Sequence, residues 1–350
     1  MKIGLLVGRT AGWLALLLCA VSLFSDFLSP SQPEAQDLER FFVPPSRIHF
    51  VDTSGAFHWR PFVYRYELVQ PLDVVYQERT DAMYPLECFT KGYPYRILGI
   101  IPSTTHLIGS RVEGVFHPWG TDELGRDVLA RTLAGARTSL IVVLLGIGVY
   151  GLLGLAVGAL AGLLGGWVDI VLMRLSEFVL ALPALYLILA LRALLPLRIP
   201  FWYTVLLTVG TIAAVTWPPM ARGVRGLILQ IRNAGYVEAA RSLGCTQWQI
   251  LTRHLLPALA PFAWAQAAVA SPVFLLGEVI LSFLNVGFQE SGISWGAMLR
   301  NMRDTRVLTD FWWNLAPLAF VFVTLLCLNI LGDRLQSARA EKAGGLPVKV

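Results

Sequence analysis

Hydrophobic residues in this chain gather in long runs with few or no charges, instead of in the stripes typical of soluble helices. The longest run, 140–166, holds 27 residues without a charge, and a helix of that length crosses a hydrocarbon core of about 30 Å with some tilt. Five more apolar runs of 18 to 25 residues lie at 10–28, 170–191, 203–220, 259–283 and 314–331. The pattern predicts an all-α polytopic membrane protein with six transmembrane helices.

Three glycines recur at every fourth residue of the longest run, at Gly154, Gly158 and Gly162. This spacing places them on one face of a helix, where the absence of side chains lets a neighbouring helix approach closely. We expect a tight helix contact along this face.

The first run follows Lys2 and Arg9, as the apolar part of a secretory signal peptide does. Its exit at 25–30 has no A-x-A cleavage site, and Cys19 is not preceded by the small residues expected before a lipidated cysteine. An uncleaved helix therefore fits these flanks better than a signal peptide. We predict that residues 1–29 form a cytoplasmic N-terminus and the first transmembrane helix.

Residues 30–118 are hydrophilic and rich in aromatic side chains, with 8 Lys and Arg against 10 Asp and Glu. Apolar and polar residues alternate at 47–52 and 62–69, between Pro, Gly and Asp residues, which is typical of short strands. We predict a small β-rich extracytoplasmic insert at 30–118. The other five helices then form a core over 119–335, followed by a cytoplasmic tail at 336–350.

Composition excludes an ordinary soluble domain, since 55% of the residues are hydrophobic, 15% are charged and the mean hydropathy is +0.61. The net charge of +5 comes from 24 Arg and 4 Lys scattered around apolar runs, without the basic face that binds nucleic acid. We therefore expect a lipid bilayer, and no nucleic acid, among the partners.

Basic residues in short loops indicate the orientation of a membrane protein. With the N-terminus inside, the inner segments 1–9, 222–257 and 332–350 carry 11 Lys and Arg, and the short outer loops 192–202 and 284–311 carry 5. The long polar insert is not counted, because large domains cross regardless of charge. Both termini and the 222–257 loop are therefore predicted to be cytoplasmic.

This cytoplasmic loop contains the pattern of a short amphipathic helix. Residues at i, i+3, i+4 and i+7 place four side chains on one face, namely Tyr236, Ala239, Ala240 and Leu243. Gly244 follows and can adopt the left-handed conformation that ends a helix. We expect the small alanines to lie on an exposed face.

A second short helix is predicted directly afterwards, because Thr246-Gln247-Trp248-Gln249 has the form of a capping box. The helix continues through His254 and is expected to end at Pro257. The product is a helical hairpin with a single acid, Glu238, among arginines, and such a shape suits docking into a groove of another protein. A hairpin lying on lipid headgroups is the alternative that the pattern leaves open.

Three segments resemble one protein family. The motif Glu238-Ala239-Ala240-x3-Gly244-x9-His254-x-Leu256-Pro257 resembles the EAA loop of ABC importer permeases, in the form of the dipeptide, oligopeptide and nickel permease subfamily. Residues 117–140 resemble the start of that subfamily's second helix, and residues 281–287 with 294–299 resemble the stretch after its fifth. The resemblance covers about 117–335 and implies the ABC importer type I permease fold.

The resemblance also implies a role for the hairpin. In such transporters the EAA loop is the coupling helix, which sits in a cleft of a separate ATPase subunit. Glu238 is expected to meet an arginine of the ATPase, Ala239 and Ala240 to permit close approach, and Gly244 to set the bend. The coupling motif ends in His254, Leu256 and Pro257.

The implied function is one permease subunit of a bacterial inner-membrane importer for peptides or a related small solute. The implied partners are a homologous permease subunit, two cytoplasmic ATPase subunits and an extracytoplasmic solute-binding protein. ATP and Mg²⁺ belong to the ATPase subunits, so this chain is expected to hold no cofactor and not to be an enzyme. The residues agree, because none of the four lysines (Lys2, Lys91, Lys342 and Lys349) stands in the Gly-Lys-Ser/Thr context of a P-loop.

The chain departs from the subfamily in places. Ala258 replaces the usual Asn, Asn285 replaces a Gly, and the 30–116 segment is longer than the common first outer loop. We expect this longer segment to contact the binding protein or to cover the pore entrance. The cargo itself is left open.

Several charged residues lie outside these motifs. Glu177 and Glu278 fall within predicted spans, where ionisable groups are functional candidates. We assign them to gating or helix packing ahead of substrate contact, because importers of this class take specificity largely from a binding protein. Arg126 and Asp127 are predicted to form an interfacial ion pair. The histidines show no metal-ligand spacing, so no metal site is predicted.

Two other functional classes remain as alternatives. A secondary, ion-coupled transporter usually shows two related halves with broken helices, and the sequence shows neither. A membrane-embedded enzyme needs a set of catalytic residues, and the sequence suggests none.

Overall fold

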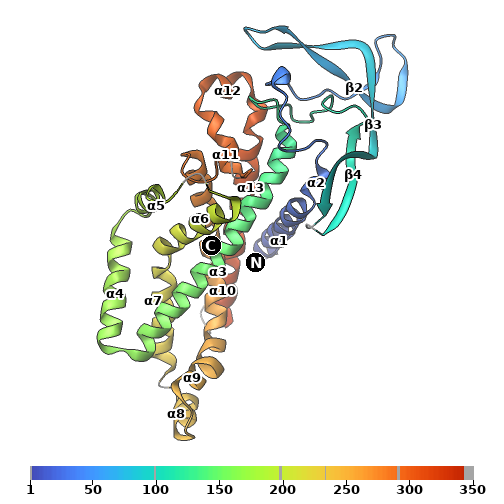
Figure 1. Ribbon diagram of the computed structural model, residues 1–350. Helices are drawn as coiled ribbons and strands as arrows, with labels where there is room; N and C mark the ends of the chain where they lie inside the picture. Colours follow the sequence, from blue (N-terminus) through green and yellow to red (C-terminus); the bar gives the residue numbers. More distant parts are fainter. Residues whose placement is uncertain (1, 98–99, 197–198, 233, 290–291, 343–350) are drawn as a thin grey trace. The chain divides into compact units, whose positions relative to one another are not determined.

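Figure 1 shows the computed structural model, which describes residues 2–97, 100–196, 199–232, 234–289 and 292–342. The predicted tail at 336–350 is therefore described only up to Lys342, and 343–350 lies outside the described residues. The chain forms two compact units: one comprises Met1–Ala15, Ile141–Leu281 and Leu325–Val350, and the other comprises Leu16–Leu140 and Ser282–Thr324.

The polar N-terminal segment contains a four-stranded antiparallel sheet in the order β1-β2-β3-β4. Its strands are β1 (His49–Val51), β2 (Phe57–Gln70), β3 (Val75–Ile97) and β4 (Ile101–Ser110). The predicted strand at 62–69 lies within β2, whose Val63 packs in a small core with Leu86, Val115 and Phe116. The predicted strand at 47–52 contains β1. Strand β3 lies outside the predicted strands, and its 23 residues pair first with β2 and then with β4.

Three helices among the described residues are long and apolar enough to cross a membrane. They are α3 (Val128–Leu164), the continuous helix Trp248–Phe283 and the helix Trp312–Ser337. The second comprises α9 (Gln247–Ile250), a π-helical turn (Leu251–Leu255) and α10 (Leu256–Phe283), and most of the third belongs to α13 (Ala316–Lys342).

Two predicted spans are broken. Helices α4 (Gly166–Ala181) and α5 (Ala184–Ala193) meet at 95°, and α6 (Phe201–Thr216) and α7 (Pro218–Ile231) meet at 53°. Pro183 and Pro218 lie at the breaks, where a proline removes a backbone N–H and clashes with the preceding turn. The span predicted at 203–220 therefore ends early, and α7 continues beyond it as a separate helix.

Counting each bent pair as one span brings the described candidates to at most five. Helix α1 (Lys2–Leu23) adds only a shorter apolar stretch, Gly12–Leu23. The number six therefore stays a prediction. The remaining elements are short: α2 (Ser25–Leu28), α8 (Gly235–Ser242), α11 (Trp295–Leu299), α12 (Thr305–Asp310) and 3-10 turns at Leu38–Arg40, Arg300–Arg303 and Trp312–Leu315.

The glycine stripe of α3 packs against α7, which confirms the predicted close helix contact. A Cβ at Gly158 would lie 2.5 Å from the carbonyl oxygen of Ala221, and Cβ atoms at Gly154 and Gly162 would also lie closer than 3 Å to α7 side chains. The helices can approach this closely only because the three residues lack side chains.

Candidate functional site: the helical hairpin between α7 and α10

Helix α8 exposes three of the four residues predicted to share its outer face. Tyr236, Ala239 and Leu243 are exposed, and 85% of the Leu243 surface is accessible. Ala240 is buried, as is Val237, so the expectation that both alanines face outward is wrong for Ala240. Val237 and Ala240 are three residues apart and form an inward face. Val237 is the large apolar residue in the sequence from which this inward face could have been predicted.

Gly244 ends α8 in the left-handed conformation expected from the sequence, with a φ of 85°. The amide of Cys245 donates to the carbonyl of Ala240 over 3.1 Å, which is the long hydrogen bond of a Schellman motif. No described atom lies within 4 Å of the position of a Cβ at Gly244. The backbone angle, and not crowding, therefore favours glycine here.

The capping box that opens α9 is formed in both directions. The amide of Thr246 donates to Oε1 of Gln249 over 2.8 Å, and the amide of Gln249 donates to Oγ1 of Thr246 over 3.3 Å. Two local motifs, a helix end at Gly244 and a helix start at Thr246, therefore shape a tight hairpin.

The second arm does not end at Pro257, contrary to the prediction. Leu251–Leu255 forms a π-helical turn, in which the amide of Leu256 donates to the carbonyl of Leu251. This wider turn ends directly before Pro257, which has no N–H to continue the regular α-helical pattern. The chain then runs on as α10 to Phe283. The hairpin is thus continuous with a long apolar helix.

His254 and Leu256 are both partly buried, on either side of the fully buried Leu255. The His254 ring lies 6.3 Å from the ring of Tyr236 on the first arm. Pro257 is exposed. Of the residues at the end of the motif, His254 is thus the one that contacts the first arm.

The outward side of the hairpin is an apolar surface with charges beside it. Leu243 and Trp248 are 85% and 70% exposed, and Glu238 and Arg241 are exposed on the same short helix. Exposed apolar side chains with charges beside them suit contact with another protein or with lipid headgroups.

The ion pair predicted between Arg126 and Asp127, in the loop before α3, does not form, because each residue has a different partner. Nε of Arg126 lies 2.7 Å from Oδ2 of Asp122, and Oδ2 of Asp127 lies 2.9 Å from Nδ1 of His117. Asp127 also accepts from the amide of Ala130 over 2.8 Å, as an N-cap residue of α3 does. Capping turns the Asp127 side chain away from Arg126, so each finds another partner.

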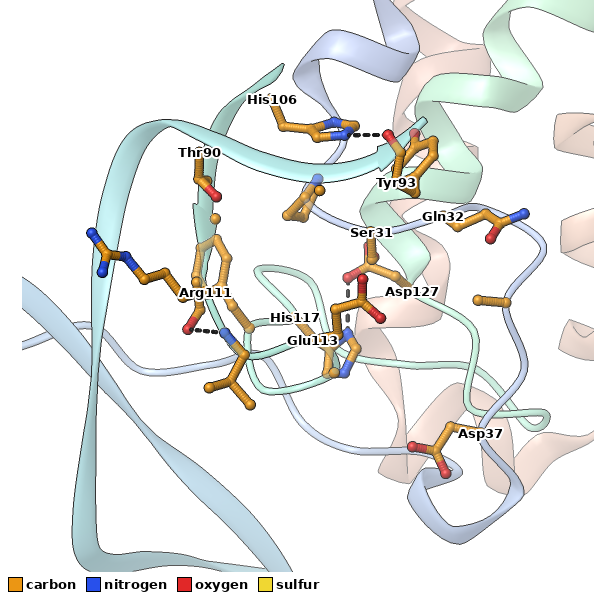
Figure 2. Close-up of a pocket in the computed structure, with 18 of the residues that line it drawn as sticks. Ser31, Gln32, Asp37, Thr90, Tyr93, His106, Arg111, Glu113, His117 and Asp127 are labelled. Carbon is orange, nitrogen blue, oxygen red and sulfur yellow. Dashed lines mark hydrogen bonds and ion pairs between the residues drawn. The ribbon is translucent and has the colours of Figure 1, made fainter. Parts of the chain in front are cut away.

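Figure 2 shows a cavity of about 360 Å³ beside this His117 and Asp127 pair. Acidic and basic side chains both line it, including Asp37, Glu113 and Arg111. This cavity could not be predicted from the sequence, because its lining is spread from residue 30 to residue 127. The cavity offers polar contacts. Among the described residues that line it, no hydroxyl group is hydrogen-bonded to a histidine or a carboxylate that could act as its base.

The two acidic residues of the predicted spans lie in different surroundings. Glu177 is exposed, and its Oε2 lies 2.7 Å from Nη1 of Arg174. Glu278 is fully buried in α10. Their assignment to gating or packing stays a prediction. Within the described ranges, no group of three His, Cys, Asp or Glu side chains is placed to hold a metal ion.

Comparisons with known proteins identify similar transport proteins. Residues 154–342 match the family described as binding-protein-dependent transport system inner membrane component. The dipeptide transport system permease protein DppC of Bacillus subtilis is 37% identical over 227 residues, which cover 65% of this chain and 69% of that protein. The oligopeptide transport system permease protein OppC of Haemophilus influenzae is 34% identical over 227 residues, covering 65% and 71%.

One solved structure, of the methionine ABC transporter MetNI in inward-facing conformations, overlaps 59% of this chain and 95% of its own at 15% identity. The TM-score of 0.43 is too low to support an argument about the fold.

Proposed function

The chain belongs to the family of binding-protein-dependent transport system inner membrane components, and on that basis we propose that it is a permease subunit of an ATP-driven bacterial ABC importer. Relatives named as dipeptide and oligopeptide permeases support a peptide, or a related small solute, as the cargo. The observation that carries the proposal is the α8–α9 hairpin, which combines the EAA-like motif with an exposed apolar surface around Leu243 and Trp248.

In this proposal the hairpin docks into a cleft of a cytoplasmic ATPase subunit. Glu238, which is exposed, pairs with an arginine of the ATPase, and the exposed Ala239 permits close approach. Ala240 contributes to the inner packing of the hairpin instead. Gly244 fixes the bend, and His254, Leu256 and Pro257 join the second arm to the long apolar helix. Movement of the ATPase is transmitted along Trp248–Phe283, because that helix is continuous.

The chain is one of several subunits in this proposal. A homologous permease forms the other half of the pore, two ATPase subunits bind ATP and Mg²⁺, and a solute-binding protein delivers cargo from outside. This chain binds no cofactor of its own. The outer segment at 30–116 contacts the binding protein or covers the pore entrance. Unchanged transport and binding-protein docking after removal of its sheet would contradict that role.

The proposed topology has six crossings and two cytoplasmic termini. Residues 1–29 contain the first crossing, 30–118 lies outside, and 119–335 forms the five-helix permease core before the 336–350 tail. The excess of 11 over 5 basic residues in the short inner segments supports this orientation.

Affinity purification of the tagged chain from its native host in mild detergent tests the proposal. We expect a P-loop ATPase to co-purify with the wild type and to be reduced about tenfold or more by Glu238→Arg, because reversing one partner of an interface ion pair weakens docking. Glu67→Arg is the matched control, since Glu67 is an exposed carboxylate in β2, outside the hairpin. Equal recovery of the ATPase with both variants would contradict coupling through the hairpin.

A further inference from the structure

The far end of the β3–β4 ribbon carries an apolar face. Ile97 pairs with Ile101 and Tyr95 pairs with Ser103, and cross-strand partners point to the same side of a sheet. Tyr95, Ile97 and Ile101 therefore share one face, and Ile100 lies in the adjoining turn. Ile100 and Ile101 are 78% and 60% exposed. We call these four residues, Tyr95, Ile97, Ile100 and Ile101, the apolar tip.

The turn between β1 and β2 in the same sheet has the opposite character. Its residues 52–55 are Asp, Thr, Ser and Gly, and the carboxylate of Asp52 accepts from the amide of Ser54 over 2.8 Å. A hydrogen bond from His58 lowers the pKa of Asp52 below its usual range. A polar turn whose side chains hydrogen-bond to its own backbone is typical of a water-exposed surface. The apolar tip consists instead of residues that favour a nonpolar environment.

The ribbon is attached to α2, the short helix that directly follows α1. His106 is buried, and its Nδ1 and Nε2 lie 2.9 and 3.0 Å from the carbonyl oxygens of Asp26 and Tyr93. The ring of Phe89 lies 6.3 Å from the ring of Phe27. Helix α2 therefore holds the ribbon at its middle and leaves its end free.

The direction of the ribbon follows from its place in the fold. Figure 1 shows the β3–β4 ribbon pointing from α2 in the direction of α1. Five residues from His106 to Ile101 extend the ribbon by about 16 Å beyond its anchor.

We propose that the apolar tip inserts into the outer leaflet of the lipid bilayer and fixes the outer domain to the membrane surface. The inference rests on the proposed function, in which α1 spans the membrane and α2 lies at its outer boundary. A ribbon that turns back from α2 along α1 meets lipid headgroups first and acyl chains at its end.

The residues around the tip fit this environment. Tyr93, Tyr95 and Arg96 come just before the isoleucines, and aromatic and basic side chains are typical of the boundary between headgroups and hydrocarbon. Pro94 and Pro102 each remove one backbone N–H from the ribbon. Fewer donors without partners lower the cost of placing a two-stranded ribbon among lipids.

A protein surface is the competing occupant of the tip. Lipid is favoured because the apolar tip points toward α1, which carries exposed leucines of its own. Leu16, Leu17 and Leu23 are 61%, 58% and 48% exposed. In the proposed topology those leucines face acyl chains, and the apolar tip is surrounded by the same acyl chains. The test below separates lipid from protein and from water.

Nitroxide labels at single cysteines measure the surroundings of the tip in the assembled transporter. The four native cysteines are replaced by alanine, and Ile100→Cys is compared with Thr53→Cys in the polar turn and Leu152→Cys on α3, which is 71% exposed. The complex is reconstituted in vesicles of phosphatidylethanolamine and phosphatidylglycerol. Spin relaxation by oxygen, which enriches in lipid, is compared with relaxation by a water-soluble nickel chelate.

We expect the oxygen-to-nickel ratio at Ile100 to be severalfold higher than at Thr53 and to approach the ratio at Leu152. A ratio at Ile100 equal to that at Thr53 would overturn the inference, because the tip would lie in water. Shielding of Ile100 from both reagents would also overturn it, because protein would cover the tip. A water-like ratio at Leu152 would instead refute the proposed membrane function.

Discussion

At the scale of single residues, Gly158 shows how the sequence permits close helix packing. A Cβ at this position would lie 2.5 Å from the carbonyl oxygen of Ala221 in α7, and a backbone atom cannot move aside as the end of a flexible side chain can. Gly148 lies in the same helix, but no described atom is within 4 Å of its Cβ position. The two glycines therefore form a matched pair for mutation.

We predict that Gly158→Ala destabilises the protein by about 1–3 kcal/mol, because the new methyl group forces α3 and α7 apart. Gly148→Ala should be neutral or stabilise the helix by up to about 1 kcal/mol, since alanine has the higher helix propensity. Thermal unfolding of both variants in detergent measures the difference. Equal shifts in melting temperature would show that α3 and α7 do not pack through Gly158.

Tyr76, in the four-stranded sheet, gives a prediction for alkaline pH. Burial, with a smaller contribution from Asp37, raises the pKa of Tyr76 to about 12, and its hydroxyl donates to the carbonyl of Phe41 over 2.8 Å. Because the folded pKa exceeds the ordinary value of about 10, the neutral side chain stabilises the fold fully below about pH 10. That contribution is lost as the pH rises from about 10 to about 12.

The ultraviolet absorbance of phenolate, measured as wild type minus Tyr76→Phe, should titrate with a midpoint near pH 12. Near-ultraviolet circular dichroism, recorded on the same samples, reports whether the fold persists. A midpoint near pH 10 in protein that is still folded would show that Tyr76 is exposed to water.

At the scale of elements, the start of α9 depends on a reciprocal pair of hydrogen bonds between Thr246 and Gln249. Thr246→Ala should cost about 1 kcal/mol of local helix stability, because it removes the N-cap acceptor. Hydrogen exchange of the amides in Gln247–Ile250 should then become about fivefold faster. Thr252→Ala is the control, since the Thr252 hydroxyl donates to the carbonyl of Trp248 and caps nothing. Equal acceleration by both substitutions would contradict the role of the cap.

The elements also show which features could be predicted from the sequence. The turn at Gly244, the capping box at Thr246 and the glycine stripe each depend on residues within one or two helical turns, and the structure has all three. The strand pattern at 62–69 was predictable for the same reason. Such local signals need no knowledge of the rest of the fold.

Features that depend on tertiary packing were missed. Ala240 is turned inward together with Val237, which the pattern of small residues did not indicate. The helix continues through Pro257 because a π-helical turn precedes it. Asp127 caps α3 and pairs with His117, so it does not pair with Arg126. For Asp127, a partner ten residues away decided between the local alternatives.

At the scale of the whole molecule, the family match and the outer domain concern different parts of the chain. The match covers residues 154–342, whereas the sheet lies at 49–110. The sheet therefore lies outside the residues that the family match covers. Asn285, which stands where the subfamily has Gly, adopts a φ of 65° and so keeps the left-handed backbone of a glycine position.

The central claim is that ATP hydrolysis in partner subunits drives transport through the α8–α9 hairpin. Uptake of a labelled dipeptide into liposomes that contain the purified complex and its binding protein tests this claim most directly. We predict uptake that requires ATP and that Glu238→Arg abolishes. Uptake by this chain without ATPase subunits, driven by an ion gradient alone, would contradict the claim and establish a secondary transporter.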